Sequence, residues 1–245
     1  MILIEKTNVM GFEQAIRAIR NPMNSSDSGI CKGGDDGIGC VNCAANPCSH
    51  GYDHSFQIGK NDYYLMMKLI KSGPVHAEFR RMITVYVDIT APLYWWKEFD
   101  TFNATYKVDT VAYSCSTMHK IHDKKFEMSD FSTDRLLPSS FKCLGFTVKT
   151  LNDYRDLYLE CEGHNKKDYW WQMIQLLPSS YNQKRTIMLN YEVLAGIYEH
   201  RKNHEFDEWK EFCKWVDLLP WSAIITCNSI KKGELSMTES FLHSH

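Results

Sequence analysis

The stretch that decides the predicted fold is Ser72–Ile121, SGPVHAEFRRMITVYVDITAPLYWWKEFDTFNATYKVDTVAYSCSTMHKI. Residues 82–90 are apolar and β-branched, which is typical of a strand. Pro92 suits the first turn of a helix because it has no amide hydrogen to lose. A polar loop follows this helix and ends at 113–119, where hydroxyl, thiol and imidazole groups are concentrated. The order strand, helix and polar loop predicts an α/β domain, and the polar loop is either part of a binding site or a very polar turn.

The predicted helix is unusually rich in large rings, which are Tyr94, Trp95, Trp96 and Phe99. Such rings can pack in a core or at a subunit contact, or they can stack on a flavin or pyrimidine ring. Both interpretations remain open at this stage. On the preceding strand, Asp88 is expected either to lie on the solvent side or to be paired with another group, and its alternation with Val85 and Val87 favours the solvent side.

The layout of these parts resembles the flavin-dependent thymidylate synthases. His76 stands near the Glu-His pair of that family, and Lys97 keeps one positive charge in the helix where the family has Arg-His-Arg. Glu98 and Phe99 replace the following His and Arg, so the motif is not intact. A later segment, 190–201, is similar to the family's C-terminal Asn-x-Arg-x-Leu helix.

The resemblance implies a fold, an activity and a set of site residues. The implied fold is α/β (α+β), with a mixed or antiparallel sheet flanked by long helices. The implied catalytic residues are Ser116 and His119 in the polar loop. Cofactor contacts are implied for His76, Arg80, Lys97 and Asn190. Substrate contacts are implied for Tyr94, Lys97, Ser116, His119 and Arg201, of which Arg201 is the best candidate for a phosphate anchor because a guanidinium grips two oxygens at once.

The implied activity is transfer of a reduced one-carbon unit to a pyrimidine deoxynucleotide of the dUMP type. FAD would be the cofactor, and NADPH and a folate one-carbon donor would be needed for turnover. Two alternatives stay open: a catalytically altered or non-catalytic nucleotide-binding relative, and a structural or protein-partner oligomer.

The composition limits the class of protein. The chain has 245 residues, 44% of them hydrophobic and 24% charged, which is ordinary for a globular protein. A net charge of −2 gives no basic field for polymeric nucleic acid, and the sequence has no apolar run long enough for a membrane span. Nine cysteines, several of them isolated, predict reduced thiols in the cytoplasm.

A segment rich in glycine and cysteine, at about 25–56, is predicted to be a loop insertion in one domain of residues 1–228, with a polar tail at 229–245. Four of its residues have the side chains of a zinc site: Cys40, Cys43, Cys48 and His50. A second Cys-x-x-Cys pair at a regular distance is missing, so a zinc site is the weaker interpretation and a loop without metal is preferred.

Hydrophobic periodicity predicts the remaining elements. Strands are expected at 2–4 and 141–148. Helices are expected at 11–20, 63–71, 151–162, 166–177, 186–202 and 205–219. The surplus of Trp and Tyr on several helices predicts a homo-oligomer, a tetramer if it follows the family.

Overall fold

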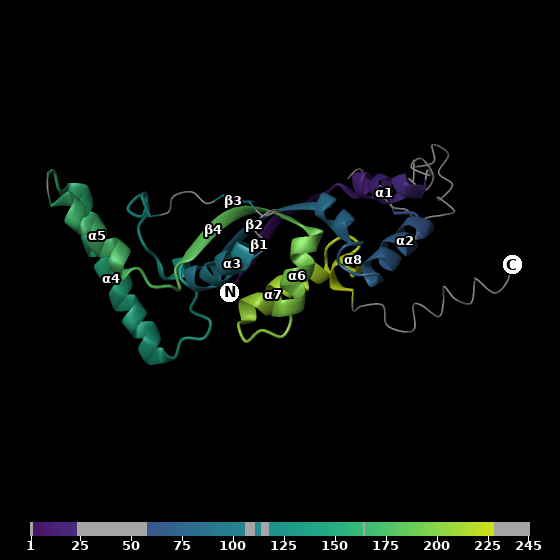
Figure 1. Cartoon of the computed structure of the whole chain (residues 1–245). Coiled ribbons are helices and arrows are strands. Elements are labelled where there is room, and N and C mark those ends of the chain that lie inside the picture. The colour runs from purple at the N-terminus through teal and green to yellow at the C-terminus, as the bar shows by residue number, and fades with distance from the viewer. Residues whose placement is uncertain (1, 24–57, 106–110, 114–117, 164, 228–245) are drawn as a thin grey trace, which may run out of the picture. The chain divides into compact units, whose positions relative to one another are not determined.

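A computed structural model describes residues 2–23, 58–105, 111–113, 118–163 and 165–227 (Figure 1). A four-stranded antiparallel sheet has the order β1-β2-β4-β3, and helices accompany it, so the predicted fold class is confirmed. The strands are β1 (Leu3–Met10), β2 (Thr84–Pro92), β3 (Val111–Tyr113) and β4 (Asn182–Asn190). The helices are α1 (Phe12–Arg20), α2 (Lys60–Lys71), α3 (Leu93–Thr105), α4 (Pro138–Glu160), α5 (Lys166–Leu176), α6 (Tyr191–Arg201), α7 (Asp207–Asp217) and α8 (Ala223–Thr226).

The predicted strand and aromatic helix are present as β2 and α3. Val85, Val87 and Ile89 of β2 are buried, and the chain passes from Pro92 directly into α3. Arg80 and Arg81, which precede the predicted strand, lie in a short 3₁₀ helix, η2 (Glu78–Met82), and β2 begins at Thr84 rather than at residue 82.

The prediction of one helix over 186–202 is wrong in its first part. Residues up to Asn190 form β4, on which Gln183, Ile187 and Leu189 are buried in alternation. The helix begins only at Tyr191, because the Asn190 side chain accepts a hydrogen bond from the Val193 amide at 2.9 Å and caps α6.

The predicted strand at 141–148 is also wrong, since these residues lie inside α4. Pro138 starts this helix, and Leu144, Val148 and Leu151 are buried at helical spacing. The β-branched residues Thr147 and Val148 suggested a strand, but packing against neighbouring elements overrides that local preference. The break predicted near Gly163 is confirmed, because the residue has a φ of +121° and separates α4 from α5.

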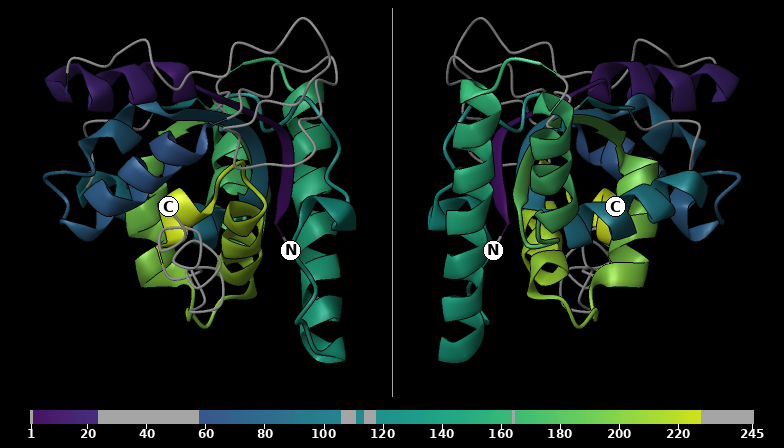
Figure 2. Two further views of the ribbon diagram at one scale, coloured as in Figure 1. Left: turned by 90° about the vertical axis from the view of Figure 1, so that its right-hand side faces the viewer. Right: turned by 90° about the vertical axis from the view of Figure 1, so that its left-hand side faces the viewer.

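Helices α4 and α5 pack against each other as a hairpin (Figure 2). The core of this region is apolar and comprises Ile121, Phe126, Phe131, Leu144, Val148, Leu151 and Met173. Polar contacts tie the segment 118–126 to it: Asn152 exchanges hydrogen bonds of 2.9 Å with the Phe126 backbone, and the Trp170 indole donates to the Met118 carbonyl at 3.0 Å.

The chain divides into two compact units made of separate segments. Unit 1 contains Met1–Thr7, Val87–Ile187 and Glu205–Phe212, and unit 2 contains Asn8–Tyr86, Met188–His204 and Cys213–His245. In unit 2, α1 packs against η2 and α2, and α6 packs against η2 and α8. Its most deeply buried groups include Ile16, Met66 and Tyr191, and the Phe12 ring meets the Tyr191 ring edge to face at 5.5 Å.

Asp88 lies on the same side of β2 as Tyr86 and opposite to Val85 and Val87, as the alternation predicted, but it is covered and paired there. It is 8% exposed and accepts a hydrogen bond from Thr186 at 2.7 Å, with the Lys6 and Lys184 ammonium groups 3.5 Å away. The Thr186 hydrogen bond lowers the pKa of Asp88 most, burial opposes it, and the two lysines lower it further. A carboxylate with these partners can be buried at low cost.

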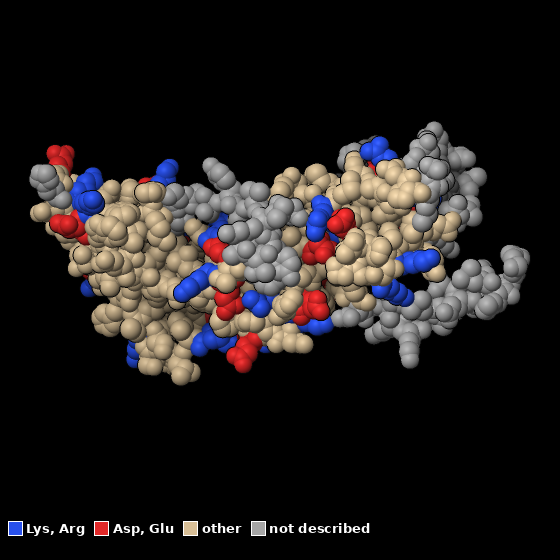
Figure 3. Space-filling view, viewed as in Figure 1, with Lys and Arg blue, Asp and Glu red and all other residues tan. Residues whose placement is uncertain are grey.

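Several predictions concern residues outside the described ranges. The insertion at 25–56, its residues Cys40, Cys43, Cys48 and His50, and the tail at 229–245 all belong to this group. Among the residues that are described, no group of three or more His, Cys, Asp or Glu could hold a metal ion. Within the same ranges, no helix is both long and apolar enough to cross a membrane. Lys and Arg are interspersed with Asp and Glu on the face shown in Figure 3.

Candidate functional site

Helix α3 has one face in the core of unit 1 and the opposite face at the surface. Trp95, Trp96 and Phe99 are at most 1% exposed, and Trp96 donates its indole hydrogen to the Gln183 carbonyl of β4 at 2.9 Å. Trp95 and Phe99 pack on Trp209 and Phe212 of α7, with ring centroids 4.8–6.5 Å apart. The choice left open between core packing and ligand stacking is therefore decided for these three rings: they form the core.

Tyr94 lies at the start of α3 and uses its polar group within the protein. Its hydroxyl donates a 2.5 Å hydrogen bond to Glu208, and its ring meets Phe206 edge to face at 5.6 Å. Burial, followed by the Glu208 carboxylate, raises the pKa of Tyr94 well above its usual value. The phenol is thus a neutral donor held by Glu208 at physiological pH.

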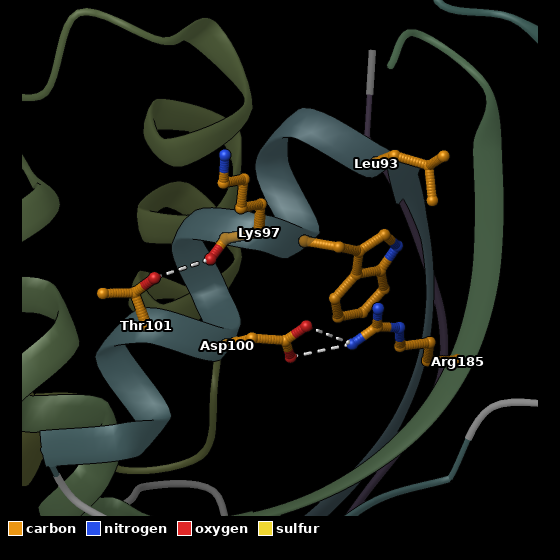
Figure 4. Close-up of a pocket in the computed structure, with 6 residues that line it drawn as sticks. Leu93, Lys97, Asp100, Thr101 and Arg185 are labelled. Atoms are coloured by element: carbon orange, nitrogen blue, oxygen red, sulfur yellow. Dashed lines mark hydrogen bonds and ion pairs between the residues drawn. The ribbon is translucent and has the colours of Figure 1, made fainter. Parts of the chain in front are cut away.

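A pocket of about 590 Å³ lies along the surface side of α3 (Figure 4). Its volume is in the range of small-molecule sites, about 300–1,000 Å³. It is lined by Leu93, Trp96, Lys97, Asp100 and Thr101 of α3 and by Arg185 of β4. We call it the Lys97 pocket.

Arg185 forms the floor of the Lys97 pocket and is held from three sides. Its guanidinium lies over the Trp96 ring at 4.3 Å, Nη1 donates to both Asp100 oxygens at 2.8 and 3.0 Å, and Nε donates to Gln183 Oε1 at 2.9 Å. Its side chain is 15% exposed. A guanidinium fixed in this way presents a flat, charged surface on which a planar ring can stack.

Lys97 is exposed, and its ammonium has no ion-pair partner among the described residues. Figure 4 shows that its side chain extends away from the Asp100–Arg185 pair. Its long flexible stem lets the ammonium act as a point charge over a range of positions around the pocket. With Asp100 offsetting Arg185, the lining carries a formal charge of +1, all of it from Lys97.

Four of the predicted site residues belong to unit 2. His76 is exposed in the turn before η2, and Asn190 is buried as the N-cap of α6. Arg80 is buried and donates to Glu192 at 3.3 Å and to the Cys227 sulfur at 2.7 Å. Arg201 is half-buried at the last residue of α6, with Nη1 3.5 Å from the His200 carbonyl.

Neither of two pockets in unit 1 is lined by more than one of the predicted site residues. Lys97 lines its pocket without any other predicted residue, and His119 lines a second pocket in unit 1. Ser116 lies outside the described ranges. Arg185 and Asp100 were not predicted, although alternation over 183–189 would have placed Arg185 on the same side of a strand as Ile187 and Leu189.

Comparison with known proteins identifies the fold but not the family. No protein-family model matches the chain, and no curated protein matches it by sequence. Among solved structures, it is similar to a flavin-dependent thymidylate synthase ThyX from Helicobacter pylori complexed with FAD and dUMP, at 14% identity and a TM-score of 0.55, covering 92% of this chain and 97% of that chain.

A second structure of Thymidylate Synthase X from Helicobacter pylori with FAD and dUMP gives 14% identity and a TM-score of 0.57, covering 92% of this chain and 98% of that chain. A UMP/dUMP methylase PolB from Streptomyces cacaoi, bound with 5-Br dUMP, gives 10% identity and a TM-score of 0.54, covering 93% of this chain and 95% of that chain. The chain therefore has the fold found in ThyX thymidylate synthases and in this methylase.

Proposed function

We propose that this protein binds a pyrimidine deoxynucleotide of the dUMP type in the Lys97 pocket. The observation that carries the proposal is the arrangement of an exposed lysine beside a fixed guanidinium in a pocket of ligand size. Lys97 would hold the phosphate, and the pyrimidine would lie on Arg185. The similar structures that contain dUMP or 5-Br dUMP support this choice of ligand class.

The residues of the pocket match one phosphate group better than two. Lys97 is the single cation of the lining without an ion-pair partner in the described part of the chain, because Arg185 is bound to Asp100 and Gln183. For a pyrophosphate such as that of FAD, the lining offers the Lys97 ammonium but no second cation free of an ion pair. We therefore assign no flavin contact to the Lys97 pocket.

The proposed ligand is tested by thermal unfolding with and without dUMP. We expect dUMP to raise the melting temperature of the wild type, because a ligand that binds only the native state stabilises it. Lys97→Met should remove most of the shift, since a hydrogen bond to a charged group contributes about 1.5–3 kcal/mol. Lys149→Met removes another exposed lysine, on α4, and should leave the shift unchanged.

Arg201 provides the competing prediction from the sequence. If Arg201→Ala abolishes the dUMP shift and Lys97→Met does not, the nucleotide is bound elsewhere and the assignment to the Lys97 pocket is wrong. No shift at millimolar dUMP in the wild type would contradict nucleotide binding altogether. A structural or protein-partner oligomer would then be the better interpretation.

A second candidate is the full activity of a flavin-dependent thymidylate synthase. It is favoured by the fold, which is shared with proteins solved with FAD and dUMP. Reduced flavin would supply the hydride for the one-carbon transfer, with NADPH and a folate donor as co-substrates. Homo-oligomerisation belongs to this proposal and is supported by exposed apolar side chains on α4, including Phe146 at 75% exposed.

Flavin binding distinguishes the second candidate from a nucleotide-binding relative without methyl-transfer activity. If the second candidate is right, the protein keeps a flavin absorbance spectrum after incubation with FAD and removal of the excess. The Arg-His-Arg motif is absent, and Arg185 is already paired with Asp100. Both observations favour a colourless protein whose melting temperature still rises with dUMP. Retention of stoichiometric FAD would contradict that expectation and favour the enzyme.

A further inference from the structure

A second pocket lies at the end of the α4–α5 hairpin, with no lining residue in common with the Lys97 pocket. It has a volume of about 440 Å³ and is lined by His119, Tyr158, Gly163, Lys166, Lys167 and Trp170. All six residues belong to unit 1. We call it the hairpin pocket.

The charge of the hairpin pocket is positive and is not offset by its lining. Lys166 and Lys167 give a formal charge of +2 before any contribution from His119, and no carboxylate lines the pocket. Neither lysine has an ion-pair partner among the described residues. The Lys97 pocket carries only +1, because Asp100 offsets one of its two cations. The lining of the hairpin pocket is therefore more positive than that of the Lys97 pocket, although Asp168 also lies in the first turn of α5.

One of these charges is held in place by a ring. The Lys166 ammonium lies 4.8 Å from the centroid of the Tyr158 ring, within the roughly 6 Å range of a cation–π contact. The His122 ring packs on the same tyrosine, with centroids 4.4 Å apart. A positioned ammonium loses less conformational entropy on binding an anion than a free lysine side chain does.

Trp170 supplies a ring for a planar ligand. Its indole hydrogen already bonds the Met118 carbonyl at 3.0 Å, so its polar group is occupied and its orientation is fixed. The side chain is half-buried, which leaves part of its aromatic surface at the pocket. An aromatic surface beside two lysines is the combination that binds a base and its phosphates together.

We propose that the hairpin pocket binds an organic polyphosphate with a planar ring, of the nucleoside diphosphate type. The phosphates would lie on Lys166 and Lys167, at the first turn of α5, where the helix dipole also favours negative charge. The ring would stack on Trp170. This site is separate from the proposed dUMP site and does not depend on it.

The test uses the full chain and four probes: ADP, adenosine, inorganic pyrophosphate and a single-stranded oligonucleotide. Isothermal titration calorimetry should show ADP binding more tightly than either part alone, and hydrogen exchange should show ADP protecting residues 158–171. A Lys166→Met, Lys167→Met double variant should weaken ADP binding by about tenfold or more, as expected for lost charge-assisted contacts. A Lys142→Met, Lys149→Met variant removes the same charge from exposed positions of α4 and should change ADP affinity by less than about twofold.

Lys97→Met should leave ADP binding unchanged, which separates this result from that of the proposed dUMP site. The proposal is overturned if millimolar ADP gives neither heat nor protection, or if the two double variants weaken binding equally. Pyrophosphate binding as tightly as ADP would show that no ring is recognised, and would overturn the ligand class. A single-stranded oligonucleotide bound far more tightly than ADP would replace a small ligand with a nucleic-acid partner.

Discussion

Trp209→Ala is expected to lower the free energy of unfolding by about 3–5 kcal/mol, the usual cost of removing a buried large aromatic side chain. Trp209 is fully buried and packs on Trp95, Phe99 and Phe212, with centroids 4.8, 6.4 and 5.7 Å away. Its indole hydrogen also bonds Glu98 at 2.9 Å. Alanine at this position would leave a cavity and remove the hydrogen bond from the indole to Glu98.

Chemical denaturation of the variant and the wild type measures this difference. Trp171→Ala is the matched control, because it makes the same change at a tryptophan that is 42% exposed on α5. We expect the control to cost about 1 kcal/mol or less. Equal losses in the two variants would show that the aromatic cluster of α3 and α7 is not the core of unit 1.

Gly11→Ala is expected to destabilise the protein by about 2–5 kcal/mol, from a left-handed backbone and a steric clash together. Gly11 has a φ of +99° at the start of α1. A Cβ built on it would lie 2.0 Å from the Met82 carbonyl oxygen, which is a backbone atom and cannot move aside like a flexible side chain. The close approach joins the start of α1 to the segment before β2.

Gly73→Ala separates the two causes. Gly73 has a φ of +111°, so alanine there has the same backbone strain, but no atom lies within 4 Å of the added Cβ. We expect this variant to lose about 1–2 kcal/mol, the cost of the left-handed conformation alone. If Gly11→Ala is no more destabilising than Gly73→Ala in urea unfolding, α1 does not approach Met82 as described.

Helices and strands could be predicted from the sequence where local preference and tertiary packing agree. The β2 strand and the aromatic helix α3 were predicted because a β-branched run, a proline and a cluster of rings all favour one boundary. At β4, local preference and tertiary packing disagree. The helical pattern of α6 extends back in the sequence to residue 186, but strand pairing and the Asn190 cap override it. At α4, burial at helical spacing overrides the β-branched residues Thr147 and Val148.

The candidate site was predicted in part for the same reason. Lys97 was named because it stands in the predicted helix where the resembled family has Arg-His-Arg, and its role in binding stays a prediction. Arg185 was missed because its role depends on a contact with Trp96, which is far away in the chain and becomes visible only once α3 packs on β4. The Asp100–Arg185 pair likewise joins residues 85 positions apart. A pattern of neighbouring residues in the sequence does not indicate a contact between residues so far apart in the chain.

A calorimetric cycle of two proteins and two ligands tests whether Lys97 holds the phosphate of a pyrimidine nucleotide. The wild type and Lys97→Met are each titrated with dUMP and with deoxyuridine, which lacks the phosphate. We expect Lys97→Met to weaken dUMP binding by about 1.5–3 kcal/mol and to leave deoxyuridine binding nearly unchanged, so that the coupling energy belongs to the contact between Lys97 and the phosphate. Equal losses for both ligands, or no loss for either, would contradict this expectation.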